Sequence, residues 1–206
     1  MYEQHATKVQ AYSQRSADNM ADTVIMVLLS IQQNWLTVGE MLDDVRKTKQ
    51  DSRFLWRSKK AGYTYIMTHK HKIHSQMMAV INSHKSRDDK ALSLMRIFLR
   101  VPGLGLPKAG FVCQLTAGLV GCMDVHNIKM YDLDTRVLTL DKNVKSEAKI
   151  TAKIQDYVKL CHDYGTEFLW NSWCEYLSTK SDKWADGFHV SEVHYTYLTG
   201  DKKWMT

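Results

Sequence analysis

The sequence is poor in the residues that interrupt helices. Its 206 residues include only 2 prolines and 10 glycines, which leaves little material for the repeated tight turns of a β-sandwich or barrel. Residues that favour helices, such as alanine, leucine, methionine, lysine and glutamine, are frequent. With 44% hydrophobic residues, the chain is long enough to bury one sizeable core. We therefore predict an all-α protein that folds as a single compact unit.

Cysteine is also scarce, and long apolar runs are missing. Cys113, Cys122, Cys161 and Cys174 form no Cys-x-x-Cys pair and are too few for a disulfide scaffold in a chain of this size. No run approaches the roughly 18 apolar residues of a membrane span, and the N-terminal stretch lacks the apolar segment of a signal peptide. We expect a cytoplasmic protein with reduced thiols and no membrane contact.

Positive charge exceeds negative charge in this chain. The formal net charge is +6 and the pI is about 9.0, which suits a polyanionic partner but is common among proteins that bind no nucleic acid. The stretch 53–62 mixes aromatic and basic residues. In it Arg57, Lys59 and Lys60 can neutralise phosphates while an aromatic ring stacks on exposed bases. A solvated basic face over a buried Trp56 explains the same pattern equally well.

A run of histidines, His69-Lys-His-Lys-Ile-His74, raises the question of a metal site. His71 and His74 share one face of the predicted helix, but no carboxylate or cysteine ligand follows at helical spacing. We expect this run to be a surface feature, and we expect neither a metal nor a cofactor.

Hydrophobic periodicity predicts most of the helices. The helix over 21–33 is apolar almost all around, so we expect it to be buried. Gly62 is expected to permit a sharp turn before Tyr63. For the tail, 180–206, the alternation of apolar residues leaves two possibilities open, docking on the surface or a short strand. The predicted helices cover residues 3–18, 21–33, 36–47, 65–82, 88–100, 107–117, 125–131, 146–164 and 166–177.

The most informative stretch is Val101-Pro-Gly-Leu-Gly105, between two predicted helices. Pro102 disfavours the helical conformation for the preceding residue, while Gly103 and Gly105 allow positive φ and a close approach of the backbone. The N–H groups of such a turn, together with the N-terminus of the following helix, suit phosphate oxygens. A hairpin of this kind can bind a nucleic-acid backbone without reading its sequence. We predict DNA contacts for Pro102, Gly103, Leu104, Gly105 and Lys108.

The hairpin and the segment Met123-Asp-Val-His126 together resemble the paired signature of the helix-hairpin-helix DNA glycosylase superfamily, an L-P-G-V-G turn followed by V-D-[TV]-H. Upstream, Val24-Ile-Met-Val-Leu-Leu-Ser-Ile-Gln32 resembles the "LLSxQ" helix end of that family. The resemblance spans roughly residues 20–135. It implies a two-lobed, all-α glycosylase (HhH-GPD) fold with a helix-hairpin-helix motif. Residues 20–135 would form one lobe, and 1–19 with 136–206 the other.

The resemblance also implies roles for individual residues in binding double-stranded DNA. Asp124 would be the catalytic carboxylate beside the sugar of an extruded nucleotide, where it stabilises positive charge at C1′. Gln32 would enter the DNA near the extruded base, and Asn127 would make a polar contact. Asp124 can instead cap the helix predicted over 125–131, and Gln32 can simply belong to a polar helix end.

Two departures from the family pattern narrow the expected activity. The nucleophilic lysine of bifunctional members stands two residues after the second hairpin glycine, where this chain has Pro107. Lys108 follows one residue later, about 100° around a helix, and the family's four-cysteine iron–sulfur loop is absent. We expect a monomeric, monofunctional N-glycosylase acting on a modified or damaged base.

Two alternatives remain open. Some bacteriophage relatives are thought to transfer an amino acid or a polyamine onto activated hydroxymethyl-thymine, and a protein of that kind would work in the host cytoplasm. The other alternative is a DNA-binding protein without catalysis.

Overall fold

The computed structural model describes residues 2–123, 125–133, 138–140, 146–179 and 190–200. All regular elements within these ranges are helical, so the predicted all-α class is confirmed for this part of the chain. None of the helices described here is long and apolar enough to cross a membrane.

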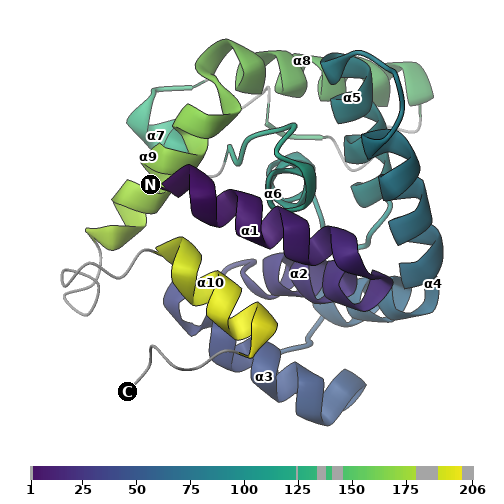
Figure 1. Ribbon diagram of the computed structural model, residues 1–206, viewed down its shortest axis with the longest axis vertical. Coiled ribbons are helices and arrows are strands. Elements are labelled where there is room, and N and C mark those ends of the chain that lie inside the picture. Colours follow the sequence, from purple (N-terminus) through teal and green to yellow (C-terminus); the bar gives the residue numbers. More distant parts are fainter. Residues whose placement is uncertain (1, 124, 134–137, 141–145, 180–189, 201–206) are drawn as a thin grey trace.

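The helices pack around α6, which lies at the centre of the molecule with α1, α2 and α5 against it (Figure 1). Residues of α6 from Ala109 to Thr116 are all buried. The elements in chain order are α1 (Tyr2–Arg15), α2 (Ala17–Leu29), η1 (Trp35–Thr37), α3 (Val38–Thr48), η2 (Lys49–Asp51), α4 (Ser58–Ile81), α5 (Arg87–Phe98), α6 (Leu106–Ala117), α7 (Val125–Met130), α8 (Glu147–Tyr164), α9 (Thr166–Ser178) and α10 (Val190–Thr199).

Helix α2 is buried on all sides over its second half, as its apolar sequence predicts. Every residue from Val24 to Leu29 is at most 2% exposed, because α1, α3, α4 and α6 all pack on this helix. The side chain of Ser16 caps its N-terminus by accepting a hydrogen bond from the Asn19 N–H at 3.1 Å. The C-terminal end of α2 is consequently held in a fixed position next to α4 and α6.

Helices α5 and α6 pack on each other and are joined by the predicted hairpin. Gly103 has φ +93, a left-handed conformation that glycine adopts without strain, and the Leu104 N–H closes the turn on Val101 O at 3.1 Å. Gly105 has φ −87 and precedes the first residue of α6. Pro102, Gly103 and Gly105 are exposed, whereas Leu104 is buried. The local helix, turn and helix are as predicted, and the two-lobed glycosylase fold stays a prediction.

The start of α4 differs from the sequence-based expectation. The helix begins at Ser58 rather than near Tyr65, so Gly62 lies inside a helix and forms no turn. A Cβ at Gly62 would lie 2.5 Å from Pro102 O and 2.9 Å from Leu28 Cδ2. The glycine is needed because α4, the hairpin and α2 approach one another closely here. The hydrophobic pattern missed this first turn because Lys59, a charged residue, occupies one of its buried positions.

The described part of the tail forms helix α10 and docks on the surface, so the strand alternative is wrong for residues 190–199. In α10, the ring of Tyr197 lies over Gly39 of α3, where a Cβ would be 2.0 Å from the ring. The Tyr12 hydroxyl donates to Leu198 O at 2.8 Å, and the Arg46 guanidinium donates to the carbonyls of Tyr197 and Leu198 at 2.7 Å each. Helices α1 and α10, from opposite ends of the chain, thus pack against each other (Figure 1).

The close approach of α4 and the hairpin can be tested with a pair of glycine variants. Gly62→Ala should lower the free energy of unfolding by about 1–3 kcal/mol, because its Cβ would overlap the main chain of the hairpin. Gly105→Ala is the control, since its Cβ would meet only Pro107 Cδ, at 4.0 Å, and the change should stay below about 1 kcal/mol. Urea denaturation measures both, and equal destabilisation would contradict the packing described.

Candidate nucleic-acid interface

The C-terminal end of α2 is the point where the hairpin and the Gln32 segment meet. Ser30 caps this end, and its hydroxyl donates to Val27 O at 2.6 Å. Lys108, in the first turn of α6, donates from Nζ to Ser30 Oγ at 2.9 Å. Lys59, in the first turn of α4, donates from Nζ to Leu29 O at 2.8 Å. Two ammonium groups therefore tie the N-terminal turns of α4 and α6 to the same helix end.

These two lysines form a positively charged centre beneath the hairpin. The end of α2 attracts them because its last carbonyl groups carry partial negative charge. Lys59 is only 2% exposed. Its burial, together with the nearby charge of Lys108, lowers the pKa of Lys59 to about 8. Lys108 is half-buried, and its Nζ lies 5.6 Å from the ring centroid of Phe111.

The ring of Trp56 lies beside this centre, close to Lys59 and to one further cation, Arg57. Trp56 is 36% exposed, so the alternative of a basic face over a buried tryptophan does not hold. Its ring centroid lies 5.2 Å from Arg57 Cζ and 5.3 Å from Lys59 Nζ, within cation–π range. Arg57 and Lys60 are exposed at the start of α4. The predicted mixture of aromatic and basic groups is thus present on the surface.

The hairpin lies directly against this part of α4. A Cβ built on Gly103 would be 3.3 Å from Ser58 Oγ and 3.3 Å from Leu28 Cδ1, so the turn sits over the residue that follows Arg57. Gln32, two residues beyond Ser30, is exposed and has φ +55, a conformation that is strained for a residue other than glycine. We call the exposed set of Pro102, Gly103, Gly105, Gln32, Arg57 and Lys60 the hairpin face.

Four residues predicted to contact DNA do not belong to the hairpin face. One of them, Lys108, is half-buried and bonded to Ser30 Oγ, and the other three are buried. Lys59 is buried and bound to a carbonyl of α2. Leu104 is 6% exposed and anchors the turn from inside. Asn127 is fully buried, and its Nδ2 donates to Cys122 O. Each of these three side chains is enclosed by the protein itself, and a role for them in DNA binding stays an untested prediction.

Asp124, the predicted catalytic carboxylate, lies outside the described residues, but the chain leading to it is firmly held. The Tyr157 hydroxyl donates to Gly121 O at 3.0 Å and accepts from the Met123 N–H at 3.1 Å. Burial raises the pKa of Tyr157 well above its usual value, so this hydroxyl keeps the proton it donates. A Cβ on Gly110 would be 2.5 Å from Tyr157 Oη and 2.9 Å from Gly121 O. The segment before Asp124 therefore runs against the first half of α6.

Aromatic rings from three elements pack behind the charged centre. The Phe111 ring centroid is 5.1 Å from that of Trp35 and 4.9 Å from that of Trp173, and the Trp35 and Trp173 centroids are 5.2 Å apart. All three side chains are buried. The sequence placed the helix carrying Trp173 in the core, but it gave no sign that Ser30 would join the two lysine-bearing helices to α2.

The lowered pKa of Lys59 predicts a specific pH dependence of stability. Below about pH 8 the lysine is charged in both the folded and the unfolded protein. The cost of burying that charge then lowers the free energy of unfolding by its full amount. As the pH rises from about 8 towards the unfolded-state value of 10.5, the folded protein releases this proton first. The free energy of unfolding then gains up to about 1.4 kcal/mol per pH unit from Lys59.

Lys59→Met removes this contribution, so the stability of the original protein relative to that variant should rise across this pH window. Urea denaturation at a series of pH values measures the difference. Lys60→Met, at the exposed neighbouring position, is the control and should keep the original pH dependence. Parallel stability curves for the original protein and Lys59→Met would refute the buried, charged state described above.

Comparisons of the chain with protein-family models, with curated proteins and with solved structures found no match. The likeness to helix-hairpin-helix glycosylases therefore rests on the residues of the hairpin, of the Gln32 segment and of the Asp124 segment. The glycosylase fold and the glycosylase activity both stay predictions.

Proposed function

We propose that this protein binds double-stranded DNA with its hairpin face and acts on a base that is swung out of the duplex. The observation that carries the proposal is the hydrogen bond of 2.9 Å from Lys108 Nζ to Ser30 Oγ. It joins the second arm of the hairpin to the helix end that precedes Gln32. This contact links the turn that we propose binds phosphate to the segment of Gln32, the side chain that we propose enters the duplex.

The electrostatics of this region favour a polyanion as partner. Lys59 and Lys108 contact a carbonyl and a hydroxyl oxygen, which are neutral groups, so these contacts leave both charges uncompensated. Arg57 and Lys60 add exposed positive charge beside them. A phosphate backbone along the exposed turn would lower the energy of all four cations. Phosphate binding by backbone N–H groups of the turn fixes the register without reading sequence.

The reaction we propose is hydrolysis of an N-glycosidic bond by a monofunctional glycosylase. Extruding a base costs a few kcal/mol, least for a modified or damaged one. Asp124 would then stabilise positive charge at C1′ while water attacks that carbon and the base leaves with a proton. Pro107 occupies the position of the Schiff-base lysine of bifunctional relatives, and Lys108 is engaged by Ser30, so no covalent enzyme intermediate is proposed.

Asp124→Asn tests this reaction. We expect the variant to lose base excision by at least about 100-fold, as removal of such a catalytic group typically does, while DNA affinity persists. The assay incubates the protein with duplexes that each carry one modified base and measures abasic sites by alkaline strand cleavage. Asp132→Asn, at an exposed position shortly after α7, is the control and should retain activity.

The same assay separates the alternatives. An amino-acid or polyamine transferase would leave no abasic site; it would displace the pyrophosphate of a pyrophosphorylated hydroxymethyl-uracil nucleotide in the DNA by the amine, and mass spectrometry would detect the substituted nucleotide and the released pyrophosphate. A binding protein without catalysis would do neither. Either outcome, obtained with DNA-bound protein and the full set of modified bases, would contradict the proposed glycosylase.

A further inference from the structure

Helix α4 has a long exposed side that begins at the hairpin and contains no acidic residue. The helix has 24 residues, among them four lysines and three histidines but neither aspartate nor glutamate. From Lys60 onwards its exposed polar side chains recur every three to four residues and so lie along one side of the helix. We call them the α4 face: Lys60, Thr64, Thr68, His71, Lys72 and Ser75. Of these, only Lys60 belongs to the hairpin face.

The α4 face continues the hairpin face. Gly103 of the turn lies against Ser58, the first residue of α4, because a Cβ on this glycine would be 3.3 Å from Ser58 Oγ. From Lys60 to Lys72 the helix then rises by about 18 Å. This length corresponds to about five base pairs along a DNA strand. A duplex that leaves the hairpin along α4 would therefore pass both lysines.

The two lysines of the α4 face carry charge that the protein does not compensate. Lys60 and Lys72 form no ion pair or side-chain hydrogen bond with any residue that the structure describes. Lys70 differs from them, because its Nζ donates to the carboxylate of Asp18 in α2. That carboxylate also attracts His71. The charges available to a partner on this side of α4 are therefore those of Lys60 and Lys72.

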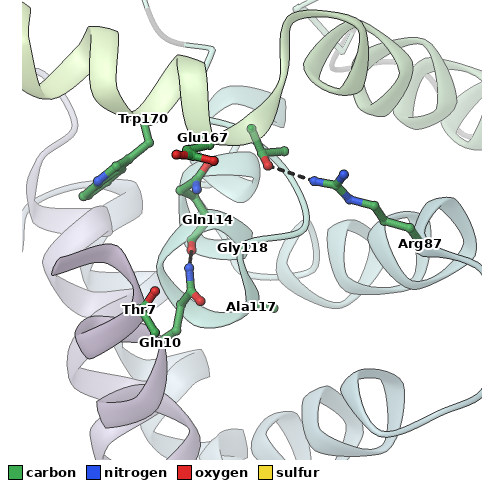
Figure 2. Close-up of a pocket in the computed structure, with 9 residues that line it drawn as sticks. Thr7, Gln10, Arg87, Gln114, Ala117, Gly118, Glu167 and Trp170 are labelled. Carbon is green, nitrogen blue, oxygen red and sulfur yellow. Dashed lines mark hydrogen bonds between the residues drawn. The ribbon is translucent and has the colours of Figure 1, made fainter. Parts of the chain in front are cut away.

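Helix α5, which also ends at the hairpin, has a different charge pattern. With α8 it forms a groove of about 520 Å³ that contains four carboxylates. Lys159 and His162 pair with two of them, which leaves the groove with excess negative charge that repels phosphates. The guanidinium of Arg87, the first residue of α5, is directed to α9, where it donates to Thr166 Oγ1 at 2.8 Å (Figure 2). The four carboxylates belong to Asp88, Asp89, Asp156 and Asp163.

We propose that a duplex bound at the hairpin face continues along the α4 face, with Lys72 and the hydroxyl groups of Thr68 and Ser75 in contact with its phosphates. This inference rests on the proposed DNA binding and adds to it the direction in which the duplex runs. Contacts of this kind position DNA without reading its sequence. They give a function to the basic run at 69–74, which the hairpin face does not include.

The salt dependence of DNA binding tests this path. Each phosphate contact made by a lysine contributes about −0.9 to the slope of log affinity against log salt concentration. Lys72→Met should therefore reduce the steepness of that slope by about 0.9 and weaken binding about eightfold at about 0.1 M salt. The measurement is fluorescence anisotropy with a labelled duplex that contains a stable abasic analogue. Lys149→Met, at an exposed position of α8, is the matched control and should bind as the original protein does.

Lys60→Met, in the hairpin face, separates a failure of this inference from a failure of the proposed function. If Lys60→Met weakens binding while Lys72→Met leaves affinity and slope unchanged, DNA binds at the hairpin without following α4, and only the inference is overturned. If the original protein binds no duplex DNA, both are overturned. A loss in Lys149→Met as large as that in Lys72→Met would likewise contradict a path along α4.

A cleavage experiment locates the path directly. Thr68→Cys introduces a thiol at an exposed position, whereas the four native cysteines are buried, so an iron–EDTA reagent attaches at position 68. Hydroxyl radicals from the tethered iron should cut the bound duplex on one side of the abasic analogue. The same reagent on Gln155→Cys, at an exposed position of α8, should give no cuts. Bound DNA that is not cut from position 68 would refute the contact with α4.

Discussion

Two lysine side chains converge on the C-terminal end of α2, and the arrangement of the surrounding helices depends on them. Lys59 holds the first turn of α4 to Leu29 O, and Lys108 holds the first turn of α6 to Ser30 Oγ. A helix C-terminus is a favourable place for cations, because its carbonyl groups lack partners within the helix. Gly62 completes the arrangement by letting α4 approach the main chain of the hairpin. The turn at 101–105 is thereby fixed at the surface.

The same contacts explain why this surface suits a nucleic-acid backbone. Burial and mutual repulsion of the two ammonium groups are unfavourable, as the lowered pKa of Lys59 shows, and a nearby phosphate would relieve part of that repulsion. Packed rings, including Phe111, lie behind the charges and keep water from screening them. Lys59 has a structural role here, whereas the exposed Arg57 and Lys60 are available to a partner.

The sequence predicted those parts of the fold that depend on local pattern. Scarce proline and glycine indicated helices, and Pro102 with Gly103 indicated the turn. The sequence-based prediction was wrong where contacts with distant residues decide the structure. Gly62 was predicted to form a turn, but it is a glycine because the carbonyl of Pro102 lies too close for a Cβ. Tyr197 likewise belongs to a helix that docks over Gly39. Charge alone also suggested that Lys59 is exposed, because the carbonyl that binds it belongs to α2. The role of Asp124 stays a prediction.

Photo-cross-linking tests the central claim, that DNA lies along the hairpin face, most directly. A photoreactive amino acid would replace Pro102, Gln32 or, as a control, Gln155, which is exposed on α8. Each protein would be bound to a duplex that contains a stable abasic analogue. Cross-links to DNA from positions 102 and 32, with few or none from 155, are the predicted result. Efficient cross-links from position 155, with none from 102 and 32, would contradict the claim.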